Sequence, residues 1–211
     1  PNDKFELRNE NEWPLKKTSW TKFYLSPDEL SLEKEIKEVN SKLSYNNLGD
    51  GITFMTESFL EDTEITGPIA SKLFISSETE DTDLFLITRL FNEQQQEVTF
   101  QGALDPKTPL AQGWLRASHR KIDNHLSKPY RPYHTHDKVE LLIPKKVYEV
   151  DIEIWPTSIV VPKGYRIGLT IKGQDYVNQS GGGSTLPNMN KFSGCGPFLH
   201  DDPIDRPNDV F

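Results

Sequence analysis

The strongest constraint on the fold is the strict alternation of apolar and acidic residues between positions 147 and 155. Four apolar or aromatic residues occupy alternate positions and three acidic residues lie between them: Tyr148, Val150, Ile152 and Ile154, and Glu149, Asp151 and Glu153. Because successive side chains of a β-strand point to opposite faces, this pattern is typical of a strand with one buried face. A second alternating run at 167–171 follows Pro156, Pro162 and Gly164, and this turn chemistry predicts that the two strands form an antiparallel pair.

Other short runs, each bounded by Gly, Pro, Asp or Asn, predict at least eight strands in all. They lie at 18–25, 52–59, 69–76, 84–91, 97–101, 113–118 and 139–143. The run at 84–91 is apolar on both faces, which indicates a central, buried strand. Helical spacing occurs only from Leu32 to Leu43, and residues 33–40 fit a helix or a strand equally well. The fold class is therefore all-β, as a sandwich, a jelly roll or a barrel.

The chain of 211 residues is long enough for one large β-sandwich, and we expect a single domain over 1–211. Residues 173–211 combine a Gly-rich run with scattered Asn and Pro, which predicts a long extended loop. Because the chain opens on Pro1 and stops after a Pro- and Asp-rich stretch, we expect it to be a piece of a longer protein.

Charge and hydropathy exclude two classes of partner. The formal net charge of -8 argues against nucleic acid, which requires clustered Lys and Arg. No apolar stretch approaches the roughly 20 residues that span a bilayer, so no membrane partner is expected. The lone Cys195 excludes an intrachain disulfide, and this weakly favours a cytoplasmic location.

The residues of a serine hydrolase are missing from the sequence. A nucleophile in the pattern Gly-x-Ser-x-Gly would sit on a tight turn, but neither Ser184 nor Ser193 has glycines at both required positions. Cys195 has only His200 near it in sequence, which favours a stray loop cysteine over a thiol nucleophile. We therefore expect no catalytic residue in this chain.

Two groups of residues raise the question of metal binding. The histidines His119, His125, His134 and His136 suggest zinc, since imidazoles two apart on a strand point to one face. Two acidic clusters suggest calcium, with Asp81 and Asp83 in one and Asp201 and Asp202 in the other. Neither group has the full ligand spacing, so solvated turns are favoured and no cofactor is expected.

At this point a family resemblance can be stated. The segments that carry it are 113–120 (Gly-Trp-Leu-Arg-Ala-Ser-His-Arg), 129–136, 150–158 (Val-Asp-Ile-Glu-Ile-Trp-Pro-Thr-Ser) and 164–167, with 65–68 and 13–14 upstream. Together they resemble the C-terminal domain of X-Pro dipeptidyl-peptidases, which is similar to that of cocaine esterase (the CocE/NonD family) and α-amino-acid ester hydrolases. The resemblance runs from about Trp13 to Pro207.

The resemblance implies a jelly-roll β-sandwich similar to galactose-binding domains. In that family the domain packs on an N-terminal α/β-hydrolase domain that carries the Ser, Asp and His, and none of the three has a matching position here. It therefore implies a non-catalytic role in supporting the catalytic domain, substrate access or assembly of an enzyme that hydrolyses esters or amides. A strand that the family domain would have after residue 200 is missing, which leaves a sheet edge open. An open edge invites pairing with another chain, so a homo-oligomer is a further expected partner.

Four residues are the expected contacts with the α/β-hydrolase domain: Arg116, Arg120, Tyr130 and Tyr133. Guanidinium and phenol groups suit hydrogen-bonded interfaces, and the Tyr130–Tyr133 segment has the composition of an exposed loop. The alternative function is a carbohydrate-binding module, because the Trp and Tyr residues could stack on sugar rings. A metalloenzyme built on the four histidines is the third hypothesis.

Overall fold

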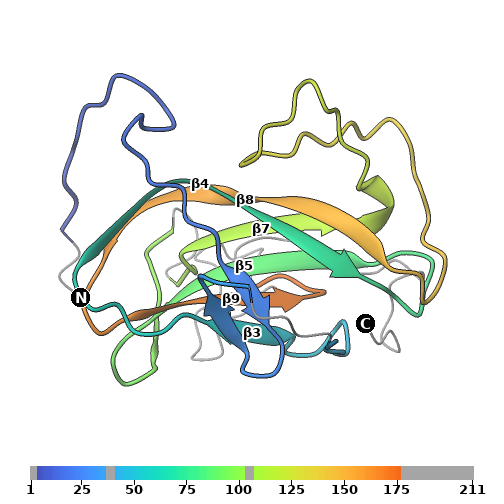
Figure 1. Ribbon diagram of the computed structural model, residues 1–211, viewed down its shortest axis with the longest axis horizontal. Helices are drawn as coiled ribbons and strands as arrows, with labels where there is room; N and C mark the ends of the chain where they lie inside the picture. Colours follow the sequence, from blue (N-terminus) through green and yellow to red (C-terminus); the bar gives the residue numbers. More distant parts are fainter. Residues whose placement is uncertain (1–3, 37–40, 103–106, 177–211) are drawn as a thin grey trace, which may run out of the picture.

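Two β-sheets lie face to face in the computed structural model, which describes residues 4–36, 41–102 and 107–176 (Figure 1). The nine strands of this part are β1 (Tyr24–Ser26), β2 (Ser31–Glu33), β3 (Ile52–Met55), β4 (Thr63–Ile75), β5 (Asp83–Phe91), β6 (Glu97–Val98), β7 (Ala111–Arg116), β8 (Tyr148–Val161) and β9 (Arg166–Lys172). A single 3₁₀ turn, η1 (Ala117–His119), is the only helix in these ranges. The predicted all-β sandwich is confirmed.

The larger sheet has seven strands in the order β1-β2-β3-β9-β5-β6, with β7 also paired to β5. Only the β2–β3 pair is parallel. The smaller sheet consists of β4 and β8, two long antiparallel strands that arch over the larger sheet (Figure 1). The predicted central position of residues 84–91 is confirmed, because β5 lies between β9 and β7 and is buried on both faces.

The core lies between the two sheets. From β8, Val150, Ile152 and Ile154 are at most 2% exposed, and they pack against Leu84 and Leu86 of β5. Each fully buried aliphatic side chain stabilises the fold by about 1.5–3 kcal/mol relative to an exposed one. The alternation that suggested a one-sided strand at 147–155 therefore identified the inner face of β8 correctly.

The predicted pairing of this strand with residues 167–171 was wrong. β8 pairs with β4, whereas β9 lies in the other sheet between β3 and β5. The acidic outer residues of β8 accordingly meet Lys72 of β4, which donates to Glu149 and to Asp151 (3.1 Å), rather than basic residues of β9. Alternation specifies which face is buried, but it does not specify which strand is the neighbour.

The predicted turn at Pro156 was also wrong, because β8 continues to Val161. The register with β4 shifts at this point, so that Trp155 and Pro156 together lie opposite Pro68. Such a bulge tolerates a proline because the extra residue makes no ladder hydrogen bond. The connection to β9 comes after it, through Pro162 and Gly164, as the turn residues there predicted.

Several predicted strands have different limits. The run at 18–25 forms a strand only from Tyr24, and those at 52–59 and 97–101 end early, at Met55 and Val98. Residues 139–143 form no strand. Leu142 is buried there and its two neighbours are exposed, which is the burial pattern of a strand without strand pairing. Of the ambiguous 33–40 region, Glu33 ends β2, and 37–40 lie outside the described residues, as does most of the predicted 173–211 loop.

The close approach of β7 to β8 depends on Gly113. A Cβ atom at this position would lie 2.1 Å from the carbonyl oxygen of Glu153. We predict that Gly113→Ala lowers the free energy of unfolding by about 1–3 kcal/mol, because the two backbones must separate. Urea denaturation measures the change. The control is Ala70→Val, which adds bulk at an exposed position of β4 opposite Glu153; an equal loss in both variants would contradict the explanation.

Candidate interdomain surface

The connection between η1 and β8, residues 120–147, stands above the smaller sheet as an irregular hairpin (Figure 1). Its two arms are joined by backbone hydrogen bonds from Asp123 to Tyr133 (2.8 Å) and from Thr135 to Lys121 (3.1 Å). At its tip, the carboxylate of Asp123 accepts from the backbone N–H of His125 and Leu126, and these bonds lower the pKa of that carboxyl. We call this segment the 120–147 loop.

The base of the loop is fixed to the sandwich by Arg120. Its guanidinium donates to the carbonyl oxygens of Ala117 and Glu140 and lies over the ring of Tyr148, 4.6 Å from the ring centre. The hydroxyl of Tyr148 in turn accepts from the backbone of Ile143 (2.9 Å). Arg120 therefore has several partners inside this chain, and an additional contact with another domain stays a prediction.

Arg116 likewise has a strong partner within the chain. Its guanidinium forms a two-pronged ion pair with Asp83, at 2.8 and 2.7 Å. The neighbouring carboxylate of Asp81 accepts from the backbone N–H groups of Thr82 and Ser118. Asp81 and Asp83, two of the aspartates considered as calcium ligands, thus use their carboxylate oxygens in bonds that connect the start of β5 to β7 and to η1. Asp201 and Asp202 lie outside the described residues.

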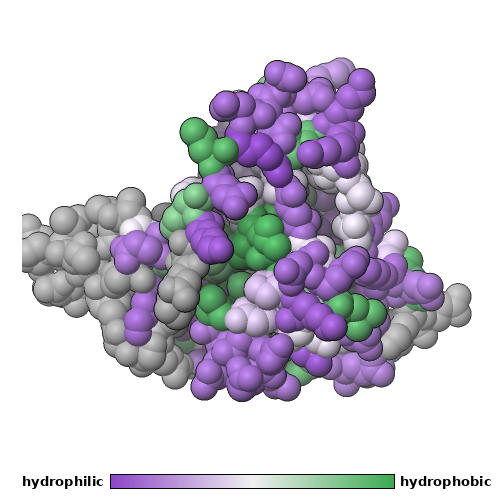
Figure 2. Space-filling model, turned by 90° about the vertical axis from the view of Figure 1, so that its left-hand side faces the viewer, coloured by the Kyte–Doolittle hydropathy of each residue, from purple (hydrophilic) through white to green (hydrophobic). Residues whose placement is uncertain are grey.

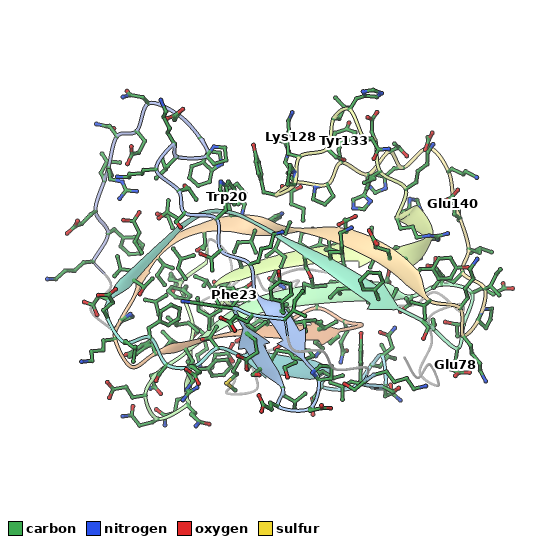
Figure 3. All side chains as sticks on the ribbon, in the orientation of Figure 1. Trp20, Phe23, Glu78, Lys128, Tyr133 and Glu140 are labelled. Carbon is green, nitrogen blue, oxygen red and sulfur yellow. The ribbon has the colours of Figure 1, made fainter. Side chains whose placement is uncertain are left out.

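The N-terminal arm, residues 4–23, rises beside the loop and contacts it through aromatic stacking. The rings of Trp20 and Tyr130 are 4.9 Å apart and nearly parallel, at 14°. Arg8 ties the beginning of the arm to Glu64 at the start of β4, with a hydrogen bond of 2.8 Å. Figure 3 shows Trp20 above β4 and β8, with Lys128 and Tyr133 on the facing loop. No sequence pattern predicts this contact, because the two rings are far apart in the chain.

Large apolar side chains are exposed on the arm, on the loop and on the outer face of β8. Trp13, Trp20 and Trp155 are 55%, 54% and 61% exposed, and Tyr133 and Val160 are exposed as well. Figure 2 shows a separate feature, a group of aliphatic and other hydrophobic side chains in the middle of one side of the molecule, below a polar lobe. Large apolar and aromatic side chains that are exposed close together mark interaction sites in soluble proteins. We call the surface formed by the arm, the loop and outer β8 the arm–loop face.

The histidines do not form the four-residue cluster that the metalloenzyme hypothesis requires. His134 lies against two carbonyl oxygens, with Nδ1 3.1 Å from His119 O and Nε2 3.0 Å from Asp151 O. His119 and His136 approach each other through their Nδ1 atoms. In the ranges that the structure describes, no group of three or more His, Cys, Asp or Glu residues is placed to hold a metal ion.

Ser184, Ser193 and Cys195, which were considered as nucleophiles, lie outside the described residues. Within the described ranges no helix has both the length and the apolarity that crossing a membrane requires.

The sequence was compared with known families and proteins. The family model described as the X-Pro dipeptidyl-peptidase C-terminal non-catalytic domain matches residues 2–194. A Mycobacterium bovis protein, provisionally named a serine esterase, is 27% identical over 132 residues, which are 59% of this chain and 19% of that protein. A Mycobacterium tuberculosis protein with the same provisional name gives the same values.

Solved structures match the fold. A CocE/NonD family hydrolase from Staphylococcus aureus superposes with a TM-score of 0.84 and 24% identity, over 97% of this chain and 36% of that chain. An aminopeptidase from a marine sediment Thaumarchaeota archaeon gives a TM-score of 0.57 and 15% identity, over 77% and 30%. This chain thus corresponds to well under half the length of each of these proteins.

The ion pair between Arg116 and Asp83 should contribute to the stability of this chain on its own. Its side chains are only 34% and 11% exposed, so we predict that Arg116→Ala lowers the free energy of unfolding by about 1–3 kcal/mol. The matched control is Arg8→Ala, whose ion pair with Glu64 is 42% and 44% exposed and should contribute much less to stability. Urea unfolding compares the two; equal losses would show that burial of the pair does not matter.

The burial of His134 predicts that the stability of the chain depends on pH. Burial lowers the pKa of His134 below its ordinary value of 6.5 and outweighs the two carbonyl oxygens, which favour the charged ring. The unfolded chain therefore binds more protons than the folded chain between the two pKa values. The contribution of His134 should be constant above pH 6.5, decrease as the pH falls from 6.5 to the lowered pKa, and level off below it. Urea unfolding of the wild type and of His134→Gln should diverge in this window; parallel pH profiles would contradict the assignment.

Proposed function

This chain belongs to the family of X-Pro dipeptidyl-peptidase C-terminal non-catalytic domains, and from this membership we propose that it serves as the accessory domain of a larger serine hydrolase. The resemblance found in the sequence is thereby confirmed. In the proposal, the sandwich packs on an α/β-hydrolase domain through the arm–loop face and helps to shape access to an active site on that domain. The parent activity would be hydrolysis of ester or amide bonds.

One observation carries the proposal: the arm–loop face combines exposed aromatic rings with a fixed backbone. The Trp20–Tyr130 stack joins arm and loop, and Arg120 joins the loop to the sandwich. Ordered aromatic side chains lose little conformational entropy on binding, which is why they are enriched at the centres of interfaces. The size of the relatives supports the proposal, since each is long enough to hold a second domain.

Among the four residues expected at the interface, the proposal assigns the leading role to the tyrosines. Tyr133 is exposed, and Tyr130 is half-buried beneath Trp20. Arg116 and Arg120 are bonded mainly within the chain, so they would act by holding β7 and the loop in place. Trp155, on outer β8 beside Trp114, joins the proposed contact set.

We predict that this purified chain neither hydrolyses a chromogenic acyl ester nor reacts with a serine-directed phosphonate, and that it binds the separately prepared α/β-hydrolase domain of its parent. Tyr133→Ala and Trp155→Ala should each weaken this binding roughly tenfold or more, since central aromatic residues dominate interface energies. Isothermal titration calorimetry measures the affinity. Both variants should keep the unfolding free energy of the chain nearly unchanged, because their side chains are exposed.

The control is Leu30→Ala, which removes an exposed apolar side chain at the β1–β2 connection, in the other sheet. It should leave the affinity unchanged. Absence of binding by the unmodified chain would contradict the packing proposal. Labelling of a serine in this chain would contradict its non-catalytic role.

A carbohydrate-binding module is the second candidate, and the exposed ring of Trp155 is the observation that favours it. Trp114 approaches this ring edge-on, with ring centres 5.3 Å apart, so the pair does not form the flat platform on which a sugar would stack most readily. Trp20, another exposed tryptophan, has one ring face covered by Tyr130. A glycan screen at millimolar ligand decides the matter, since saturable binding that Trp155→Ala removes would support this candidate.

A further inference from the structure

Two imidazole rings lie close together, one at the end of η1 and the other in the 120–147 loop. The Nδ1 atoms of His119 and His136 are 3.1 Å apart, and the ring centres are 5.3 Å apart at an angle of 41°. Two nitrogens bound to one metal ion at about 2.0–2.1 Å lie about 2.9 Å apart in square geometry and about 3.4 Å apart in tetrahedral geometry. The observed separation falls between these two values.

The backbone holds both rings in position. His119 ends η1, and His136 lies on the returning arm, where the Thr135–Lys121 hydrogen bond joins the two segments. An ion pair between Lys121 and Asp137, at 2.8 Å, braces the same segments. His136 has a φ of 51°, so its backbone is in the left-handed region, which directs its side chain toward the opposite arm only while the loop keeps this conformation.

The other histidines do not complete a larger site. Both ring nitrogens of His134 lie against carbonyl oxygens, although its ring centre is 6.0 Å from that of His136. His125 is at the tip of the loop, where its backbone bonds to Asp123. Among the residues that the structure describes, a metal ion at this place would therefore have two protein ligands, and water would fill the remaining positions.

We propose that His119 and His136 form a two-histidine site for a divalent transition-metal cation. Imidazole nitrogen suits Cu²⁺, Ni²⁺ and Zn²⁺, whereas Ca²⁺ and Mg²⁺ require oxygen ligands. The order of affinities for first-row ions places Cu²⁺ first. The charge of Asp137 favours a bound cation and the charge of Lys121 opposes it, so the site depends chiefly on the two nitrogens. The inference is independent of the proposed packing on a hydrolase domain.

The test is titration of this purified chain with Cu²⁺, Ni²⁺, Zn²⁺ and Ca²⁺, each added alone, by isothermal titration calorimetry. We expect saturable binding that is tightest for Cu²⁺ and undetectable for Ca²⁺. His119→Gln and His136→Asn should each weaken Cu²⁺ binding roughly tenfold or more, because only one ligand remains. Asparagine is chosen at 136 because it tolerates positive φ.

The matched control is His125→Gln, which removes a histidine of the same loop and should leave the affinity unchanged. A second measurement needs no variant: Cu²⁺ at substoichiometric concentration should broaden the imidazole resonances of His119 and His136 before those of His125. Equal binding by the wild type and by the double variant, or equal broadening of all the histidines, would overturn the proposal. The short Nδ1–Nδ1 distance would then be a hydrogen bond between two rings.

Discussion

The contact between β8 and the larger sheet is the constraint on which the rest of the structure depends. Val150, Ile152 and Ile154 fill the space above β5, and Gly113 allows the backbones of β7 and β8 to approach where any side chain would collide. Because protein cores are close-packed, these contacts fix the position of β8 relative to the larger sheet. Everything attached to β8 is fixed with it.

The arm–loop face is built on that fixed strand. The 120–147 loop leaves the sandwich at η1, directly after β7, and returns to it at the start of β8, so both of its ends are set by the sheet contact. The same loop supports the Trp20–Tyr130 stack and the converging rings of His119 and His136. A long connection without regular strands can therefore hold its side chains in fixed positions. Hydrogen bonds at its base take the place of the backbone hydrogen bonds that neighbouring strands of a sheet would form.

Local pattern predicted the strands and the buried faces, but it did not predict contacts between distant segments. The inner face of β8 followed from alternation, the central position of β5 from a run that is apolar on both faces, and the all-β class from many short runs separated by turn residues. The partner of β8 did not, because alternation alone does not distinguish β4 from β9 and the choice depends on the whole core. The turn chemistry of Pro156 misled for the same reason, since the bulge opposite Pro68 is a property of the pair. The aromatic stack and the intrachain partner of Arg116 likewise arise only in three dimensions.

The central claim is that the arm–loop face of this non-catalytic domain is covered by an α/β-hydrolase domain. Amide hydrogen exchange, compared between this chain alone and a full-length protein that joins it to the proposed α/β-hydrolase domain, tests the claim most directly. Our account predicts that the full-length protein gains protection in the 120–147 loop and in residues 13–23 of the arm, while the β1–β2 connection is unchanged. Equal exchange in these segments in both proteins would contradict it.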